Sequence, residues 1–239
     1  MKDVYVVGSD IGGTASKGVL LSASGRVVDS VVTVGLNYQL VGEEFVVATV
    51  AYMLEFLTRS GQEIQGVGVG VAGCGREDEQ RTLEQRIREL GTFEVVVSSD
   101  IETAAYAALL GRPGVVVVGG TGMVAYGKDP RGGSVRKGGY GFLLGDEGSG
   151  FWLGLMGLHA AIRDAEGRGQ GTVLTEKILE HVGRDSYLEA IPYFYADPQK
   201  RIADLAPVVL DAAMKQDPVA DDIVRRGTEE IAQLVLSVV

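Results

Sequence analysis

The sequence predicts an α/β protein made of two related domains, residues 1–111 and 112–239, each with a mixed sheet flanked by helices. Short apolar runs of strand length alternate with longer segments that are apolar at helical spacing. A strand, a loop of glycine and threonine and a second strand open the chain, and the same order returns at residue 115. With 239 residues, 46% of them hydrophobic, the chain can bury the core of one large or two small domains.

The first domain begins with three predicted strands, at residues 4–9, 17–23 and 26–34. Because the turns between them are short, neighbouring strands must run antiparallel. A helix is expected over 43–59, with an apolar face made by Phe45, Ala48, Tyr52, Met53, Phe56 and Leu57. The remaining predicted elements are a strand at 64–72, a helix at 77–90, a strand at 93–98 and a helix at 101–110. Together they predict a mixed sheet with helices on both faces.

The second domain repeats the opening of the first. A strand at 115–118, a loop at 119–122 and strands at 123–127 and 134–137 echo residues 4–34, which indicates an internal duplication. From residue 149 the chain is predicted to be helical, starting with helices at 149–165 and 172–182. No strand is expected after these helices, so the second sheet is predicted to hold three strands.

Composition excludes several classes of function. A net charge of −10 and an isoelectric point near 4.8 argue against a surface for nucleic acid or anionic membrane. The single cysteine, Cys74, excludes an internal disulfide and a metal site built from cysteines. The N-terminus carries no secretory signal and the chain no long apolar span, so we expect a cytoplasmic protein.

The segment 10–18 is the first candidate site. Its glycines let backbone N–H groups turn towards an anion, and the hydroxyls of Thr14 and Ser16 can donate to phosphate oxygens. Asp10, at the end of the preceding strand, can hold a magnesium ion through water. The residues expected to contact phosphates are Asp10, Gly12, Gly13, Thr14, Ser16 and Lys17. A plain glycine-rich hairpin turn is the alternative interpretation.

A second loop of this kind, Gly119-Gly120-Thr121-Gly122, follows the first strand of the second domain. Either loop alone is weak support for nucleotide binding, whereas one loop in each domain, each between two strands, is stronger. Two such loops can grip the phosphates of a nucleotide from both sides of a cleft. Gly120, Thr121 and Gly122 are therefore further candidate phosphate ligands.

Asp100 lies between the strand at 93–98 and the helix at 101–110. The structural interpretation is a helix start, because Ser99 and Glu102 fit a capping box and the helix dipole favours an acidic first turn. The functional interpretation is a base at the carboxyl end of a strand, which orients a substrate hydroxyl towards the γ-phosphate of ATP. The sequence leaves both roles open.

Two glycine-rich segments need separate interpretations. Residues 138–150 place six glycines around Asp146 and Glu147, which indicates a backbone-lined pocket where a carboxylate accepts sugar hydroxyls. The same acidic pair also suits the start of the helix that follows. Residues 68–73 fit the dinucleotide fingerprint G-x-G-x-x-G, but the first two glycines lie inside a predicted strand, so no NAD site is expected.

These motifs resemble the N-acetylglucosamine kinase branch of the BadF/BadG-type ATPases, within the actin-like ATPase and sugar-kinase superfamily. The resemblance covers essentially the whole chain and implies two ribonuclease-H-like domains that use ATP and Mg²⁺. Residues 10–14 look like the first phosphate loop of the family and 120–122 like the second. The resemblance implies sugar contacts from Asn37, otherwise a turn asparagine, and from Asp100, which also serves as base. Further implied sugar contacts are Met123, Val124, Gly139, Tyr140, Gly141 and Asp146.

Two departures from the family pattern affect these expectations. Met123 stands where the kinases usually carry a serine after Gly-Thr-Gly, which removes a hydroxyl near the phosphates or the sugar. Family members continue with a further strand, a Gly-Gly loop that contacts adenosine and closing helices, so the second domain is expected to be incomplete at its C-terminus. The iron–sulfur activators of the family bring paired cysteines to a cluster, which the single Cys74 does not supply.

The sequence therefore predicts an ATP-dependent carbohydrate kinase that phosphorylates a hydroxyl of an N-acetylglucosamine- or glucosamine-like sugar. The alternative is an ATPase or regulatory switch of the same fold that phosphorylates no sugar, and an inactive remnant is a third option. Asn37, Asp100 and Asp146 favour the kinase, because a nucleotide switch has no need of three polar groups aimed at a hydroxylated ligand. The expected partner is a small-molecule sugar, without nucleic acid or membrane, and a homodimer is one option for the oligomeric state.

Overall fold

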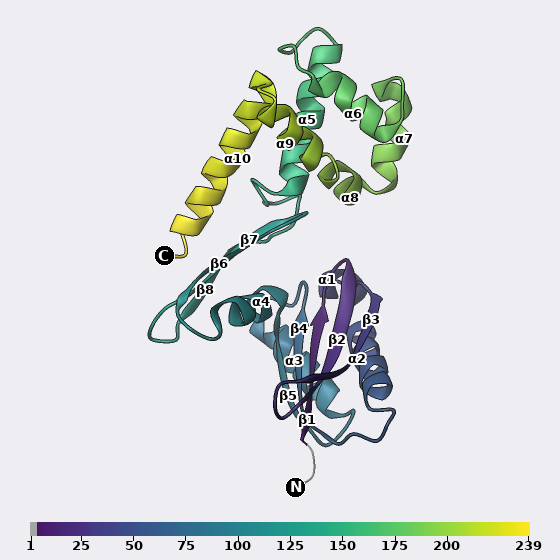
Figure 1. The fold of residues 1–239 in the computed structure, drawn as a ribbon, viewed down its shortest axis with the longest axis vertical. Coiled ribbons are helices and arrows are strands. Elements are labelled where there is room, and N and C mark those ends of the chain that lie inside the picture. The colour runs from purple at the N-terminus through teal and green to yellow at the C-terminus, as the bar shows by residue number, and fades with distance from the viewer. Residues whose placement is uncertain (1–3) are drawn as a thin grey trace. The chain divides into compact units, whose positions relative to one another are not determined.

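The computed structural model describes residues 4–239, and the chain divides into two compact units (Figure 1). Unit 1 spans Met1–Gly111 and unit 2 spans Arg112–Val239. Each unit contains its own cluster of buried hydrophobic residues. The predicted α/β class is confirmed, because each unit combines one sheet with several helices.

Unit 1 contains a five-stranded sheet with the order β3-β2-β1-β4-β5 (Figure 1). Its strands are β1 (Tyr5–Ile11), β2 (Ala15–Ser22), β3 (Val27–Val34), β4 (Ile64–Val71) and β5 (Glu94–Ser99). The first three strands pair antiparallel through short turns, as predicted, whereas β4 pairs parallel with β1 and with β5. This antiparallel start followed by parallel crossovers is the ribonuclease-H-like arrangement.

The helices of unit 1 are α1 (Tyr38–Val41), α2 (Glu43–Leu57), α3 (Glu77–Arg88) and α4 (Asp100–Leu109). Val67, Val69 and Val71 of β4 alternate into the core that α2 and α3 cover. Gly70 lies on the opposite face under α4, where a Cβ would stand 2.4 Å from the hydroxyl of Thr103. Gly70 therefore lets α4 approach the sheet closely, which explains the glycine at this position of the motif without a dinucleotide.

The predicted apolar face of α2 is partly wrong. Phe45 and Tyr52 are 62% and 52% exposed, and Ala48 is exposed as well. The helix instead buries Val46, Val47, Val50, Met53, Leu54 and Leu57. Because α2 is apolar on nearly every side, helical spacing alone fits two different faces, and only packing against the sheet selects the one built from valines.

Unit 2 opens with a three-stranded antiparallel sheet of order β6-β7-β8, formed by β6 (Gly114–Gly119), β7 (Met123–Lys128) and β8 (Ser134–Gly138). Six helices follow: α5 (Gly150–Ala165), α6 (Leu174–Val182), α7 (Tyr187–Ala196), α8 (Pro198–Ala203), α9 (Ala206–Met214) and α10 (Pro218–Leu236). No strand follows β8 in the described residues, in agreement with the sequence.

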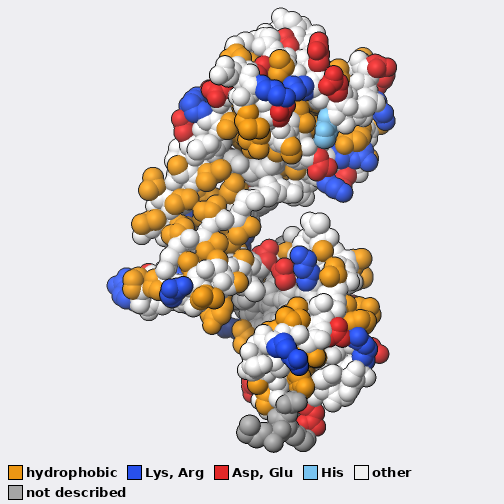
Figure 2. All heavy atoms as spheres, in the orientation of Figure 1, with side chains coloured by type: hydrophobic (Ala, Val, Ile, Leu, Met, Phe, Trp, Pro, Cys, Tyr) orange, Lys and Arg blue, Asp and Glu red, His pale blue; other side chains and the backbone are white. Residues whose placement is uncertain are grey.

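The core of unit 2 lies among its helices. Phe151, Leu158 and Ala161 of α5 pack with buried residues of the later helices, and this packing holds the N-terminal end of α5. Figure 2 shows hydrophobic side chains at the surface over the C-terminal half of α10. Within residues 4–239, no helix is both long and apolar enough to span a bilayer.

Candidate functional site

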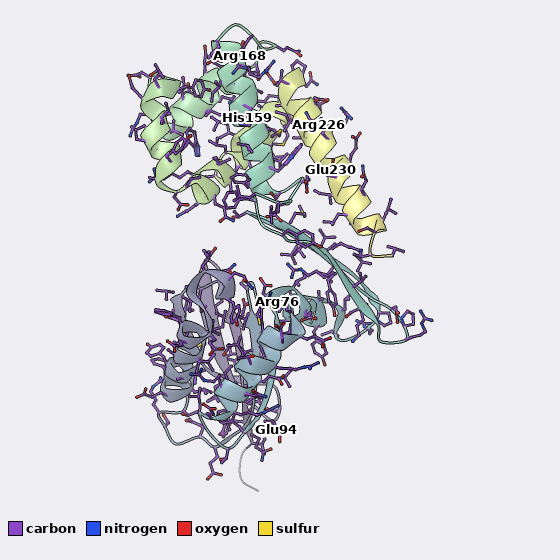
Figure 3. All side chains as sticks on the ribbon, turned by 180° about the vertical axis from the view of Figure 1, so that it is seen from behind. Arg76, Glu94, His159, Arg168, Arg226 and Glu230 are labelled. Carbon is purple, nitrogen blue, oxygen red and sulfur yellow. The ribbon has the colours of Figure 1, made fainter. Side chains whose placement is uncertain are left out.

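The predicted residues of unit 1 gather at one end of its sheet. Asp10 near the end of β1 and Ser99 at the end of β5 lie on either side of β4, and Asp100 follows Ser99 as the first residue of α4. Figure 3 shows Arg76, just past β4, at this end of unit 1 and Glu94, the first residue of β5, at the opposite end. Because ligands of such sheets bind beyond the carboxyl ends of the parallel strands, this end is the candidate site.

Loop 1 is the three-residue connection 12–14 between β1 and β2. The N–H of Leu36 donates to the carbonyl of Gly12 at 2.9 Å. Gly35 packs so closely against the loop that a Cβ there would lie 2.3 Å from the carbonyl carbon of Thr14. The backbone just after β3 thus holds loop 1 in place, and sequence reasoning missed Gly35 because this contact joins distant positions of the chain.

Ser16 and Lys17 lie in β2, so loop 1 is shorter than the predicted segment 10–18. The side chain of Ser16 is fully buried, and its Oγ has no hydrogen-bond partner among the described residues. Lys17 pairs with Asp10 across the sheet and is exposed. The correction has a physical cause, because antiparallel pairing of Ser16 with Ile11 extends the ladder into the expected loop.

Asp10 is an electrostatically unfavourable place for a negative charge. Partial burial raises the pKa of Asp10, the carboxylate of Asp100 raises it further, and Lys17 opposes both. Two carboxylates that repel each other beside a glycine loop form a place where a divalent cation lowers the free energy. The donor set therefore fits Mg²⁺ held through oxygen atoms.

The helix start that the sequence left open as one role of Asp100 is present, because Asp100 is the first residue of α4. Ser99 and Glu102 form the capping box themselves: the Ser99 N–H donates to Glu102 Oε2 at 2.9 Å and the Glu102 N–H donates to Ser99 Oγ at 3.4 Å. Asp100 Oδ1 accepts the N–H of Ile101 at 2.9 Å, and the side chain is exposed. Its carboxylate can therefore meet a ligand without loss of the helix cap.

Asn37 is the N-cap of α1, where its Oδ1 accepts the N–H of Gln39 at 3.0 Å. The turn role is therefore present, and the Nδ2 group is available to donate to a ligand oxygen. The side chain packs on Gly73, where a Cβ would lie 2.3 Å from Asn37 Oδ1. The N–H of Tyr38 donates to the carbonyl of Ala72 at 2.9 Å. These contacts join α1 to the end of β4.

Cys74 sits directly beneath this end of the sheet but is not a reactive group. Its side chain is fully buried, and burial together with the carboxylates of Glu79, Glu102 and Asp78 raises its pKa to about 12. A thiol with this pKa is protonated at neutral pH, so Cys74 is neither a nucleophile nor a metal ligand there.

Loop 2 is the three-residue connection 120–122 between β6 and β7, and the start of α5 holds it. The N–H of Gly150 donates to the carbonyl of Gly120 at 2.8 Å, and the N–H of Phe151 donates to that of Thr121 at 3.2 Å. These N–H groups belong to the first turn of α5, which would otherwise lack partners. The start of α5 therefore fixes the shape of loop 2.

Asp146 is a buried carboxylate beside loop 2, only 5% exposed, with a positive φ of 66°. A Cβ on Gly122 would lie 2.7 Å from its Oδ2, so the two residues are in contact. Burial raises the pKa of Asp146 and Glu147 raises it further, while a hydrogen bond from the Met123 N–H and the charge of Arg136 lower it. Its Oδ1 has no hydrogen-bond partner among the described residues and can accept a hydrogen bond from a donor such as a hydroxyl group.

The other residues expected around the sugar also lie near loop 2. The N–H of Gly139 donates to the carbonyl of Met123 at 2.8 Å, and a Cβ on Gly139 would lie 3.0 Å from the side chain of Val124. The side chain of Met123 is buried, whereas Tyr140 is 70% exposed. Gly141 has a positive φ of 89° and closes a turn with its carbonyl. The pairing of residue 139 with residues 123 and 124 thus joins the two stretches of unit 2 that carry these five residues, 123–124 and 139–141.

The side chains that could bind a metal ion do not cluster within the described residues. No group of three or more histidine, cysteine, aspartate or glutamate side chains is arranged to hold a metal ion there. Mg²⁺ commonly binds through one or two carboxylates together with substrate phosphates and water. Asp10 beside loop 1 is a carboxylate of the kind that such a site uses.

Comparison with known proteins decides the family. Residues 7–239 match the BadF/BadG/BcrA/BcrD ATPase family. The chain belongs to this family. The matched range includes loop 1, loop 2 and the glycine-rich segment 138–150, so the site described above lies inside the family domain.

Three relatives illustrate the similarity. The N-acetylmuramic acid/N-acetylglucosamine kinase of Clostridium acetobutylicum is 31% identical over 98% of this chain and 79% of its own length. The N-acetyl-D-glucosamine kinase of Dictyostelium discoideum is 26% identical over 100% of this chain and 80% of its own. The crystal structure of a proposed N-acetylglucosamine kinase from Chromobacterium violaceum has a TM-score of 0.79 at 27% identity, over 96% of this chain and 81% of that one.

Proposed function

We propose that this protein is an ATP-dependent kinase that phosphorylates a hydroxyl of an amino sugar such as N-acetylglucosamine or glucosamine. The observation that carries the proposal is the buried Asp146, whose Oδ1 lacks a hydrogen-bond donor beside loop 2. A sugar hydroxyl supplies such a donor, whereas an ATP phosphate does not. The names of the relatives, which are N-acetylglucosamine kinases, support the same substrate class.

In this proposal the two loops bind the phosphates of ATP. Backbone N–H groups of loop 1 and loop 2 are the donors, with the hydroxyls of Thr14 and Thr121 beside them. Asp10 would hold Mg²⁺, which neutralises developing charge on the phosphates when bound. Lys17, opposite Asp10 on β2, adds a positive charge at the same edge.

The chemical step assigns one role to each unit-1 polar group. Asn37 donates from Nδ2 to a sugar oxygen and orients the ring. The sugar hydroxyl attacks the γ-phosphorus, its proton passes to the carboxylate of Asp100, and the bond from the γ-phosphorus to the bridging oxygen of ADP breaks. Asp100 needs above all the right position for this proton transfer, and its exposed side chain, which is not part of the Ser99–Glu102 capping box, supports that role.

The test is a substrate screen with the whole chain. ADP release is measured with Mg-ATP and N-acetylglucosamine, glucosamine, glucose or N-acetylmuramic acid, and the phosphorylated sugar is identified by mass spectrometry. The proposal expects ADP release that depends on at least one amino sugar. ADP release at the same rate with and without every sugar would instead support an ATPase or switch of the same fold. No ADP release under any condition would overturn both.

A further inference from the structure

We propose that Glu79 is a positioning residue that fixes Asn37 for sugar binding. The inference rests on the proposed function, in which Asn37 orients the sugar. Glu79 lies in the first turn of α3, outside the set of residues expected to touch either substrate. It acts on Asn37 through the side chain of Gln39.

Glu79 is a buried carboxylate with several donors around it. Its side chain is only 4% exposed. Oε1 accepts Gln39 Nε2 at 2.7 Å and Arg76 Nη2 at 2.6 Å, while Oε2 accepts the Arg76 backbone N–H at 3.2 Å. This buried carboxylate is strongly satisfied, and its removal leaves the Gln39 side chain without its link to α3.

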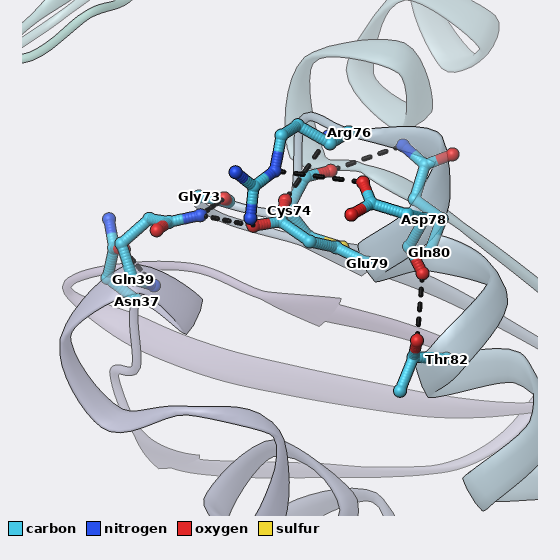
Figure 4. A network of polar contacts seen from close by, with 9 residues as sticks. All are labelled: Asn37, Gln39, Gly73, Cys74, Arg76, Asp78, Glu79, Gln80 and Thr82. Atoms are coloured by element: carbon cyan, nitrogen blue, oxygen red, sulfur yellow. Dashed lines mark hydrogen bonds and ion pairs between the residues drawn. The ribbon is translucent and has the colours of Figure 1, made fainter.

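Gln39 connects Glu79 to the turn that contains Asn37 (Figure 4). Its Nε2 donates both to Glu79 and to the carbonyl of Gly73 at 2.9 Å. Its backbone N–H donates to Asn37 Oδ1. One glutamine thus ties α3 and the end of β4 to the capping oxygen of Asn37, because its side chain and backbone bond to different elements.

The packing leaves little freedom for Asn37 while these bonds are present. Asn37 lies against Gly73, and the neighbouring Tyr38 N–H is bonded to the carbonyl of Ala72. The helix α1 that Asn37 caps is only four residues long, so its own hydrogen bonds contribute little rigidity. The contacts to Gln39 therefore decide where the Nδ2 group of Asn37 points.

Glu79 also belongs to the capping box of α3, so a purely structural role must be separated from positioning. Gln39→Ala removes the bridge while both partners of the cap, Arg76 and Glu79, stay in place. Glu77→Gln is the matched control, because Glu77 is in the same first turn, is 83% exposed and pairs with Arg81 of its own helix. The control makes the same change of charge without touching α1.

The kinetic test measures KM for the sugar and KM for ATP separately in the four proteins. We expect Glu79→Gln and Gln39→Ala to raise KM for the sugar roughly 10- to 100-fold, the size of effect that misplacement of a binding group produces. KM for ATP should stay within about twofold, and Glu77→Gln should match the original protein. An unchanged KM for the sugar in Gln39→Ala, or an equal rise in both KM values, overturns the inference.

A second measurement does not depend on activity. Hydrogen exchange of the amides of residues 38–42 reports whether the turn is held, because the N–H groups of Leu40 and Val41 bond to the carbonyl of Asn37. We expect faster exchange in Glu79→Gln and Gln39→Ala but not in Glu77→Gln. If the original protein phosphorylates no sugar, the proposed function fails, and the exchange rates still decide whether Glu79 holds the turn. Equal exchange in all four proteins overturns the inference.

Discussion

The two units begin with the same strand–loop–strand pattern and hold the loop in different ways. In unit 1 the backbone after β3 holds loop 1, through Leu36 bonded to Gly12 and through the close contact of Gly35. In unit 2 the first turn of α5 holds loop 2, through N–H groups donated to Gly120 and Thr121. The strand pair places each loop, and a segment specific to each unit gives the loop its shape.

The sheets around the loops differ as well. In unit 1 the central strand β1 has two neighbours, β2 and β4, whereas β6 has β7 alone as its neighbour in the described residues. The run 115–118 is as apolar as a strand buried on both sides, yet part of it is exposed. Within the described residues, loop 2 thus lies beside two antiparallel strand pairs, whereas loop 1 also lies beside the parallel strand β4.

The largest effect that sharpens this comparison is expected at Asp100, the exposed carboxylate at the start of α4, whereas the carboxylate beside loop 2, Asp146, is buried. Asp100→Asn keeps the shape and can still bond a sugar hydroxyl, but it cannot accept the proton. We expect kcat to fall roughly 10²- to 10⁴-fold, the usual contribution of a general base. Steady-state kinetics and a melting curve, measured on the same preparation, check this result.

The control for Asp100 is its neighbour in the capping box. Ser99→Ala removes the side-chain cap of α4 and should cost about 1 kcal/mol of unfolding free energy. We expect Asp100→Asn to keep the melting temperature and Ser99→Ala to lower it. Full activity of Asp100→Asn would show that the carboxylate is not the base.

The next largest effect is expected from alanine substitutions at the two glycines that pack against the loops, Gly35 at loop 1 and Gly150 at loop 2. A methyl group at Gly35 would lie 2.3 Å from the backbone of loop 1, whereas one at Gly150 would lie 2.9 Å from the carbonyl of Gly120. We expect Gly35→Ala to destabilise the protein by about 1–3 kcal/mol, as overpacking does, and to raise KM for ATP about tenfold. Gly150→Ala should cause a smaller loss of stability and a smaller rise in KM for ATP.

Gly68→Ala serves as the matched control for these substitutions. Gly68 lies in β4, in the sheet that carries loop 1, and a Cβ there meets no atom within 4 Å. Chemical denaturation and KM for ATP should therefore stay close to those of the original protein. Equal losses in Gly35→Ala and Gly68→Ala would mean that the close contact at loop 1 is not the cause.

The smallest effect concerns the carboxylates beside the two loops. Burial raises the pKa of both Asp10 and Asp146, so each ionised carboxylate costs folding free energy at neutral pH. We expect Asp146→Asn to raise the melting temperature by about 2–4 °C, the shift that 1 kcal/mol produces in a chain of this size. Asparagine also suits the positive φ at this position. The effect of Asp10→Asn should be smaller, because solvent screens its exposed side chain.

The stabilisation expected from Asp146→Asn should depend on pH. A carboxylate whose pKa is raised in the folded state loses its unfavourable charge as the pH falls through that pKa. The difference in melting temperature between Asp146→Asn and the original protein should therefore be largest near pH 7 and should shrink steadily towards pH 4. Melting curves between these values measure it, and a gain that grows as the pH falls would contradict the assigned direction of the shift.

Much of the fold could be predicted from local patterns. The apolar runs and short turns of residues 4–34 predict three antiparallel strands, which the structure confirms. The capping pattern of Ser99 and Glu102 predicts the start of α4. These features depend on residues close together in the sequence, so their physical causes are visible in the sequence itself.

The rest depends on contacts between distant residues. Helical spacing could not choose the buried face of α2, because both Phe45 and Val46 belong to apolar stripes. The bonds from Gln39 reach Gly73 and Glu79, which lie 34 and 40 positions further along the chain. No local pattern marks Glu79, which reads in the sequence as one more acidic residue at the start of a helix.

The inert thiol at position 74 offers a practical route to chemical labelling. Cys74 is the single cysteine of the chain, is fully buried and has a pKa of about 12. Because the thiol is buried and its pKa is raised, it is protonated at pH 7, so maleimides and iodoacetamide leave it largely unmodified. A cysteine introduced at any exposed position therefore becomes the one site that takes a fluorophore or spin label. Pairs of such labels, one in each unit, can report distances in solution without removal of the native cysteine.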